Sequence, residues 1–208
     1  MSFKIVIPAR YASSRLPGKP LLDIAGKPMI QHVYERATES EASDVIIATD
    51  DERIEQAAVS FGATVCMTQA NHPSGTDRLA EVAAKYQFAH DDIIINVQGD
   101  EPCLPAQLIN QVAVDLEQHP DADIATLYRQ ITQEKQVFDP NVVKVVMDSA
   151  GYALYFSRAP IPWMRDHFNQ QSTLPPELPH YRHIGLYGYR ASFLTHYAEL
   201  RPCTLEQE

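Results

Sequence analysis

Short apolar runs alternate with amphipathic stretches through the first half of the chain. The apolar runs predict β-strands, and the stretches between them carry apolar residues at helical spacing. This alternation is typical of βαβ units, so it predicts an α/β fold with a mostly parallel sheet covered by helices. The strands are expected at residues 4–7, 44–48, 64–67 and 92–97, followed by four more at 124–129, 142–147, 152–156 and 184–189.

Two of the helices are marked by their end residues as well as by their apolar faces. The first is expected to start with Pro28, because proline suits the first helical position, and to run to about Glu39. The second has Asp50 or Asp51 as its cap and Gly62 as its stop.

A third helix start combines a cap with a candidate binding segment. Ser74 and Asp77 have the spacing of a capping box with an acid at its third helical position. Gly75 would let a ligand approach the backbone closely, and Arg78 lies one turn further on, so the segment suits a nucleobase or sugar hydroxyls. Taken alone, the segment fits an ordinary capped helix better.

Length and composition limit the class of protein. The chain has 208 residues, 45% of them hydrophobic, which suits one domain or one domain with a small extension. No run approaches the ~20 apolar residues of a membrane span, and the N-terminus lacks the apolar core of a secretory signal. The three cysteines form no CxxC and the eight histidines no HExxH, which argues against a disulfide framework and a catalytic zinc. A soluble cytoplasmic protein is expected.

The stretch after the first strand is the most informative for function. Arg10, Arg15 and Lys19 are spaced along a loop that cannot become a helix. Arginine offers a planar fork for paired phosphate oxygens and lysine a mobile point charge, so the three cations suit a polyphosphate. This cationic loop is therefore predicted to bind phosphate, the alternative being a solvated charged loop. The residues that oppose a helix are Pro8, Pro17, Gly18 and Pro20.

Net charge narrows the class of ligand. The chain carries a formal charge of -10, yet residues 10–27 hold four cations and a single acid, Asp23. DNA or RNA would need a broad basic face, which an acidic body with one positive loop does not supply. The expected partner is a small anionic molecule.

A second chemical signal, the acidic turn, lies at the end of the fourth strand. Asp100 and Glu101 follow that strand, and ligands of open α/β sheets bind outside the carboxyl ends of the strands. The cationic loop and the acidic turn should therefore open onto the same edge. A carboxylate beside a polyphosphate suits Mg2+, which takes one or two protein oxygens together with phosphates and water. Asp100 is the expected ligand because Gly99 frees its backbone, although an aspartate here can also be a plain turn former.

Five blocks of the sequence carry a resemblance to a known family. They lie at residues 7–21, 74–78, 96–102, 155–159 and 182–190. Together they resemble the 3-deoxy-manno-octulosonate cytidylyltransferases, also called CMP-Kdo synthetases, over essentially the whole chain. The first block alone is shared with other sugar nucleotidyltransferases, such as those for sialic acid. The Arg-Leu-Pro-Gly-Lys-Pro-Leu form and the His-Ile-Gly-Leu-Tyr-Gly-Tyr run favour the Kdo enzymes.

The resemblance implies an enzyme of the three-layer Rossmann-like nucleotidyltransferase fold, with a mostly parallel mixed sheet. Its reaction would be cytidylyl transfer from CTP to the sugar acid Kdo, giving CMP-Kdo and pyrophosphate for lipopolysaccharide biosynthesis. Family members are commonly homodimers, and the apolar segment 159–168 suits either a subunit contact or a buried loop anchor. Neither nucleic acid nor a membrane is an expected partner.

The resemblance also implies roles for residues on the nucleotide side. Arg10, Lys19 and Asp100 would be catalytic, with Mg2+ as cofactor on Asp100. The cations would bind the triphosphate. The nucleotide-binding set is Arg10, Arg15, Lys19, Ser74, Gly75 and Arg78.

On the sugar side, the resemblance implies four further residues. Arg158 would pair with the carboxylate of the sugar acid, because a guanidinium matches a carboxylate in two bonds. Gln98, His183 and Tyr187 would supply hydrogen bonds to hydroxyls. From the sequence pattern alone, Tyr187 and Tyr189 fit equally well as packing residues of a strand.

We expect one nucleotidyltransferase domain over residues 1–208, with a nucleotide half at about 1–120 and a sugar-binding and dimer-contact half at about 121–208. The family pattern continues beyond Glu208 through a second metal aspartate, so the chain is expected to lack the C-terminal part and to be weak or inactive. A nucleotide-binding module without turnover is the alternative from another class. A glycosyltransferase ranks last, because the acidic turn has no Asp-x-Asp motif.

Overall fold

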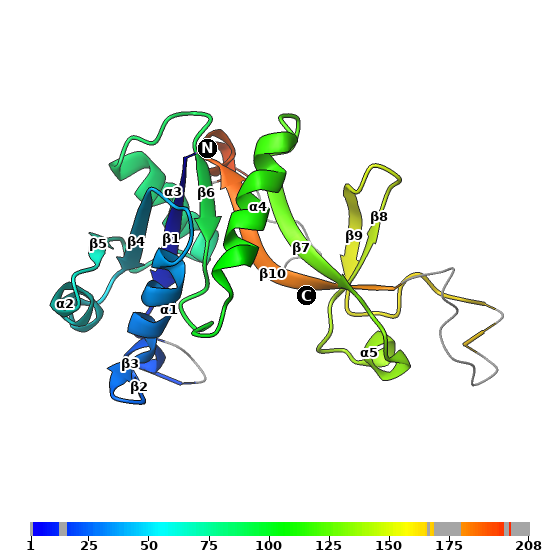
Figure 1. Ribbon diagram of the computed structural model, residues 1–208, viewed down its shortest axis with the longest axis horizontal. Helices are drawn as coiled ribbons and strands as arrows, with labels where there is room; N and C mark the ends of the chain where they lie inside the picture. Colours follow the sequence, from blue (N-terminus) through cyan, green and yellow to red (C-terminus); the bar gives the residue numbers. More distant parts are fainter. Residues whose placement is uncertain (1, 13–15, 166, 169–179, 198–199, 201–208) are drawn as a thin grey trace. The chain divides into compact units, whose positions relative to one another are not determined.

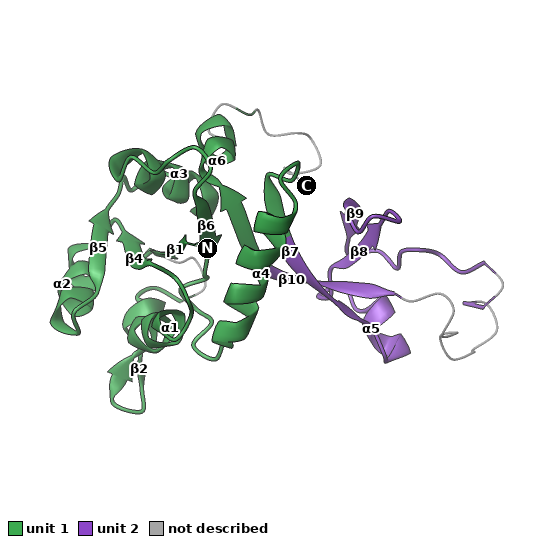
Figure 2. Ribbon diagram, turned by 45° about the horizontal axis from the view of Figure 1, so that its top comes forward, with its two compact units in different colours: residues 1–125, 186–208 green, residues 126–185 purple. Residues whose placement is uncertain are grey.

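The computed structural model describes residues 2–12, 16–165, 167–168, 180–197 and 200 (Figure 1). The chain forms two compact units, which are coloured separately in Figure 2. Unit 1 combines residues 1–125 with 186–208, and unit 2 comprises residues 126–185, so unit 2 is inserted in the sequence between two parts of unit 1. None of the described helices is both long and apolar enough to cross a membrane.

The sheet of unit 1 is mixed and mostly parallel. Strands β5 (Thr64–Met67), β4 (Asp44–Thr49), β1 (Phe3–Ala9) and β6 (Ile93–Asn96) lie in that order and run parallel. The C-terminal part of β10 (Tyr181–Arg190) pairs antiparallel with β6. These strands confirm the prediction of a mostly parallel sheet.

Helices cover both faces of this sheet (Figure 1). α1 (Met29–Thr38) packs beside α4 (Ala106–Gln118) on one face, and α3 (Gly75–Lys85) packs beside α6 (Ala191–Tyr197) on the other. α2 (Glu52–Ser60) lies against β4 and β5. Unit 1 therefore has the three-layer α/β arrangement that the sequence predicts.

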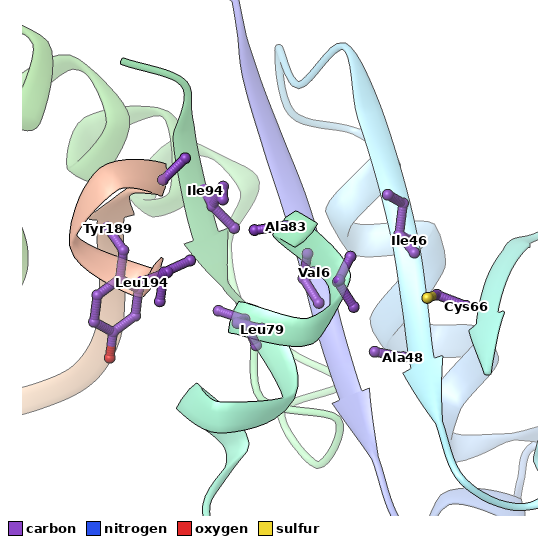
Figure 3. Close-up of a cluster of buried hydrophobic side chains, with 11 residues drawn as sticks. Val6, Ile46, Ala48, Cys66, Leu79, Ala83, Ile94, Tyr189 and Leu194 are labelled. Atoms are coloured by element: carbon purple, nitrogen blue, oxygen red, sulfur yellow. The ribbon is translucent and has the colours of Figure 1, made fainter. Parts of the chain in front are cut away.

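One layer of the core lies between the sheet and the pair formed by α3 and α6 (Figure 3). Val6 of β1 and Ile46 of β4 pack against Leu79 of α3, and Leu194 of α6 extends the same cluster. All four are buried, because β1 and β4 are continuous apolar runs covered on both faces and the helices carry apolar residues near every 3.6 positions. This core fixes the strands whose carboxyl ends carry the candidate site.

Unit 2 is built on antiparallel pairing. β8 (Lys144–Met147) lies between β9 (Ala153–Ser157) and the N-terminal part of β10. Most of β7 (Ile124–Gln130) and the short helix α5 (Glu134–Phe138) complete the unit. The four later strands predicted from the sequence are all present.

The helix ends refine the predictions. Pro28, expected as the first helical residue, is instead the N-cap of α1, which begins one residue later at Met29. Asp51 caps α2, because its side chain accepts a hydrogen bond from the Arg53 N–H, whereas Asp50 makes a different contact. Gly62 follows α2 with a φ of 83°, which fits its expected role as a stop.

Three short elements between β1 and α1 were not predicted. They are the 3-10 helix η1 (Lys19–Leu21) and a hairpin of β2 (Asp23–Ile24) and β3 (Lys27–Pro28). Elements of two or three residues are too short to show a hydrophobic period, so the sequence pattern does not reveal them.

Candidate active site

The candidate site of unit 1 lies along the carboxyl edge of the parallel strands. β1 and β6 are adjacent and parallel, so the cationic loop after Ala9 and the acidic turn after Asn96 start at the same edge. β4 ends there as well, with Thr49. The order of the strands therefore brings the cationic loop and the acidic turn together.

The cationic loop is closed by its own backbone. The Gly18 N–H donates to the Tyr11 carbonyl at 2.9 Å. Gly18 has a φ of +72°, which favours glycine, and a Cβ added there would lie 3.1 Å from the Tyr11 ring. Arg10 Nη1 donates to the carbonyl of His72 at 3.4 Å, which links the loop to the segment before α3. Arg15, predicted to bind phosphate, lies outside the described residues.

The Tyr11 ring makes a second contact that fixes the cationic loop. The Arg53 guanidinium lies over this ring, 3.3 Å from its centroid. Two hydrogen bonds of 2.9 and 2.6 Å hold the guanidinium on the Asp51 carboxylate, which also caps α2. We refer to Tyr11, Arg53 and Asp51 as the loop clamp, because together they connect the cationic loop to the start of α2.

Lys19 and Asp100 join the cationic loop to the acidic turn. Lys19 Nζ donates to Asp100 Oδ2 at 2.5 Å. The side chains are 37% and 49% exposed, so this ion pair contributes little to stability. Separating Lys19 from Asp100 therefore costs little. A phosphate group can then pair with Lys19, and a metal ion can bind Asp100.

Gly99 lets the acidic turn pack against the end of β1. A Cβ at this position would lie 2.8 Å from the carbonyl oxygen of Pro8, which is too close for any side chain. The sequence predicts that Gly99 frees the backbone to orient Asp100. The structure adds that only glycine fits this close to β1. Burial raises the pKa of Glu101, and the neighbouring Asp100 carboxylate adds to the rise. A raised pKa means that Glu101 takes up a proton at higher pH than an ordinary glutamate.

Asp100 fits a magnesium ion that takes most of its ligands from a substrate. Across the described ranges, no group of three or more His, Cys, Asp or Glu side chains is arranged to hold a metal. Mg2+ does not need such a group, because it commonly uses one or two carboxylates together with phosphate and water oxygens. The half-exposed Asp100 carboxylate beside the cationic loop suits that arrangement.

The capping box predicted at the start of α3 is present. The Asp77 N–H donates to Ser74 Oγ at 3.2 Å, and the Ser74 N–H donates to the Asp77 carboxylate at 3.1 Å. A Cβ added to Gly75 would lie 3.6 Å from the Pro8 ring. The helix therefore begins beside the end of β1, at the same edge as the cationic loop.

Arg78 is fully buried, although it lies only one turn into α3. Its guanidinium donates to the Thr68 hydroxyl and pairs with Asp50 at 3.4 Å. Burial lowers the pKa of Arg78, and the Asp50 carboxylate opposes this effect. Arg78 Nη2 makes the contact with Asp50, and neither Nη2 nor Nε makes a hydrogen bond to the residues that the structure describes. Sequence reasoning missed Asp50, which it considered only as a helix cap.

Tyr187 and Tyr189 lie on the part of β10 that belongs to unit 1. Tyr189 is buried in the cluster that also contains Leu79 of α3 and Ile94 of β6, so it joins β10 to α3 and β6. Its ring stacks on that of Tyr187, with 6.0 Å between centroids. Burial raises the pKa of both hydroxyls. Tyr187 and Gln98 are half-buried, as residues that line a site commonly are.

His183 and Arg158 belong to unit 2. His183 Nε2 lies 2.9 Å from Thr126 Oγ1, and its ring packs edge-to-face against Phe156. Burial lowers the pKa of His183, which favours the neutral imidazole. Arg158 is exposed, and its Nη1 donates to the carbonyl of Pro140 at 2.7 Å. Each side chain therefore has a defined orientation within unit 2.

The structure gathers most of the predicted residues in one unit. Tyr187 lies in this unit too, on β10, whereas Arg158 and His183 belong to the other. The residues along the carboxyl edge of unit 1 are Arg10, Lys19, Ser74, Gly75, Arg78, Gln98 and Asp100.

Comparisons with known proteins find close relatives. Residues 4–208 match the cytidylyltransferase family. The 3-deoxy-manno-octulosonate cytidylyltransferase of Marinobacter nauticus is 60% identical over 212 residues, which cover 100% of this chain and 81% of that protein. The protein of the same name from Hahella chejuensis is 59% identical over 206 residues, which cover 99% of this chain and 81% of that protein.

Solved structures agree in fold. A structure of CMP:2-keto-3-deoxy-manno-octonic acid synthetase complexed with CTP matches with a TM-score of 0.87 and 45% identity, covering 99% of this chain and 80% of that one. A cytidylyltransferase from Leptospira borgpetersenii matches with a TM-score of 0.60 and 18% identity, covering 100% and 67%. The second match is a likeness of fold alone.

Proposed function

This chain belongs to the cytidylyltransferase family, and from that premise we propose that it transfers a cytidylyl group from CTP to 3-deoxy-manno-octulosonate (Kdo). The products are CMP-Kdo and pyrophosphate, and the sugar nucleotide serves lipopolysaccharide biosynthesis. The observation that carries this proposal is the contact between Lys19 of the cationic loop and Asp100 of the acidic turn. It puts a phosphate-binding cation and a metal-binding type of carboxylate within reach of one triphosphate.

The reaction needs positioning and charge stabilisation more than covalent help from the protein. A sugar hydroxyl oxygen forms a bond to the α-phosphorus of CTP while the bond to pyrophosphate breaks, and the hydroxyl proton passes to solvent. Arg10, Arg15 and Lys19 would neutralise the charge that grows on the leaving pyrophosphate. The loop clamp supports this role, because it holds the loop that carries these cations.

Mg2+ is the proposed cofactor, with Asp100 as its protein ligand among the described residues. When bound to the triphosphate, Mg2+ supplies charge neutralisation and lowers the pKa of the attacking hydroxyl. Asp100 supports this assignment by its half-exposed carboxylate and by its place beside Lys19. Lys19 would then leave Asp100 and pair with a phosphate.

Arg78, Ser74 and Gly75 are the proposed contacts to cytidine. Cytosine presents two acceptors, O2 and N3, which suit the buried N–H donors of the Arg78 guanidinium. Ser74 and Gly75 stand at the start of α3, where a small residue and a short polar one leave room for the ribose.

Arg158, Gln98, His183 and Tyr187 are the proposed contacts to the sugar acid. Arg158 is exposed, and its remaining N–H donors suit the carboxylate of Kdo. The other three are half-buried polar side chains, which suit hydroxyl groups. A neutral His183 is able to accept or donate a hydrogen bond.

A homodimer is also proposed, with β9 of unit 2 as the contact. Leu154, Tyr155 and Phe156 are 67%, 51% and 40% exposed on this strand, and such a run of exposed apolar residues is typical of an interface. Light scattering after size-exclusion chromatography should show a dimer for the wild type and a monomer for Leu154→Glu.

The proposed location is the cytoplasm, in keeping with the free thiols of Cys66 and Cys103.

The test of the proposed function is pyrophosphate release with CTP and Mg2+ in the presence of Kdo, of N-acetylneuraminate or of no sugar. Release only with Kdo is the expected result. Binding of CTP without release under any condition would favour a nucleotide-binding module without turnover. A preference for N-acetylneuraminate would favour a sialic acid cytidylyltransferase instead.

A further inference from the structure

A fully buried lysine, Lys144, lies at the centre of unit 2. It stands on β8 between the two partner strands, opposite Ser157 of β9 and Arg182 of β10. The next residues after these two partners are Arg158 and His183, the proposed sugar contacts of unit 2. Lys144 on β8 therefore lies between the strand that leads to Arg158 and the strand that carries His183.

Backbone carbonyls hold the Lys144 ammonium. Nζ donates to the carbonyls of Asp139, Val142 and Arg158 at 3.0, 2.6 and 2.6 Å. An ammonium has three donors, so these bonds satisfy it completely. Burial lowers the pKa of Lys144, and the nearby Asp139 acts against that change. Since a buried charge is costly and apolar residues often replace buried charges without loss of stability, stability alone does not explain this lysine.

The three bonds tie Arg158 to the turn that orients its side chain. Lys144 holds the Arg158 carbonyl and also two carbonyls of the turn at residues 139–142. The Arg158 guanidinium in turn donates to the carbonyl of Pro140 in that same turn. Arg158 is therefore fixed twice, by its backbone and by its guanidinium, and Lys144 binds both the Arg158 carbonyl and the turn that accepts the guanidinium.

His183 is tied to the same segment. Its N–H donates to the carbonyl of Val143 at 2.8 Å, directly before Lys144. The imidazole then reaches the Thr126 hydroxyl. A shift at the start of β8 would consequently move the His183 backbone as well as Arg158.

We infer that Lys144 is a positioning residue, which sets the Arg158 guanidinium and, through the start of β8, the His183 imidazole for binding of the sugar acid. The inference rests on the proposed function, because it requires Arg158 to bind the carboxylate of the substrate. Lys144 acts only through its neighbours, since all its donors are used by carbonyls.

Steady-state kinetics of Lys144→Met test this inference. The variant keeps the length of the side chain and removes its donors, so the KM for Kdo should rise about tenfold while the KM for CTP stays unchanged. A lysine of purely structural importance would instead lower kcat and Tm and leave both KM values as they are. Lys135→Met, at an exposed lysine of the same unit, is the matched control and should behave as the wild type.

A double-mutant cycle with Arg158→Met tests the route of the effect. If Lys144 acts through Arg158, the double variant should have nearly the same KM for Kdo as Arg158→Met alone. Fully additive effects of the two substitutions would overturn the inference.

The wild-type assay separates the inference from the proposed function. Turnover of Kdo by the wild type together with an unchanged KM for Kdo in folded Lys144→Met overturns the inference alone. A wild type that does not use Kdo overturns the proposed function, and the inference falls with it. If Lys144→Met fails to fold, Lys144→Gln, which retains amide donors, takes its place. A smaller rise in the KM for Kdo is then expected, and an unchanged KM contradicts the inference.

Discussion

The two units hold their candidate site residues in different ways. In unit 1, the cationic loop and the acidic turn leave neighbouring parallel strands at one edge, and Lys19 meets Asp100 there. In unit 2, the strands are antiparallel, so their carboxyl ends alternate between two edges. Arg158 and His183 are held instead by individual hydrogen bonds. A parallel sheet thus supplies a site through its strand order, whereas an antiparallel one needs dedicated contacts.

This difference has a kinetic consequence. Substitutions in the cationic loop or the acidic turn of unit 1 should change turnover or the use of CTP, because the proposed phosphate and metal contacts are there. Substitutions in unit 2 should change the use of Kdo. The four predictions below test whether the division holds.

Removing the carboxylate of Asp100 should have the largest effect. Asp100→Asn removes the proposed metal ligand and leaves Lys19 without its partner, so kcat should fall by about a hundredfold to a thousandfold. Pyrophosphate release at saturating CTP and Kdo, repeated over a range of Mg2+ concentrations, measures this loss. Asp91→Asn, at an almost fully exposed aspartate of unit 1, is the matched control. A normal kcat in Asp100→Asn would show that the acidic turn takes no part in the chemistry.

Glu81 gives unit 1 a set of dedicated contacts of its own. Its carboxylate accepts hydrogen bonds from His72, from Lys85 at 2.8 Å and from the Gln69 N–H at 2.9 Å. Burial pushes the pKa of Glu81 up, but the hydrogen bonds from Lys85, His72 and Gln69 prevail and lower it from 4.5 to about 2. The same segment presents the His72 carbonyl to Arg10.

Acid should therefore remove a stabilising contribution from unit 1. Because the pKa of Glu81 is depressed in the folded state, its contribution is fully present above pH 4.5 and is lost as the pH falls to about 2. The shift corresponds to about 3 kcal/mol. Urea unfolding should show Glu81→Gln less stable than the wild type at pH 7, with the difference shrinking toward pH 2. Glu117→Gln, at an exposed glutamate of α4, should show no such pH-dependent difference.

Arg158 tests the prediction that substitutions in unit 2 change the use of Kdo. Arg158→Met should raise the KM for Kdo by about tenfold to thirtyfold, because a charge-assisted hydrogen bond is lost, and should leave the KM for CTP unchanged. Arg129→Met, at an exposed arginine of β7, is the control. An equal rise in both KM values would contradict the assignment of Arg158 to Kdo alone.

The sequence predicts unit 1 better than unit 2 for a physical reason. Each strand of the parallel sheet is an apolar run, and parallel strands place their carboxyl ends together, so the meeting of Lys19 and Asp100 follows from local patterns. Lys144 has no such local signal. A lysine in an apolar run is expected to face solvent, and its burial depends on carbonyls contributed by residues 139, 142 and 158. Contacts of that kind follow only from the tertiary structure.

Arg78 and Asp50 show the same limit inside unit 1. The helical period places Arg78 near the start of α3, yet its full burial depends on Thr68 at the end of β5 and on Asp50 at the end of β4. The sequence offers two adjacent aspartates after β4 and does not say which one caps α2. Only the packed structure shows Asp51 as the cap and Asp50 beside the guanidinium.

A substitution in the loop clamp should have the smallest kinetic effect of the four. Arg53→Met removes the guanidinium from the Tyr11 ring but keeps the Arg53 N–H bond to Asp51, so α2 retains its cap. An exposed cation–π contact is worth about 0.5–1 kcal/mol, so the KM for CTP should rise about twofold to fivefold. Arg36→Met is the control, since Arg36 also pairs with a nearby carboxylate, that of Glu39. Because the clamp holds only the cationic loop, a rise in the KM for Kdo of the same size would contradict the assignment of this loop to CTP alone.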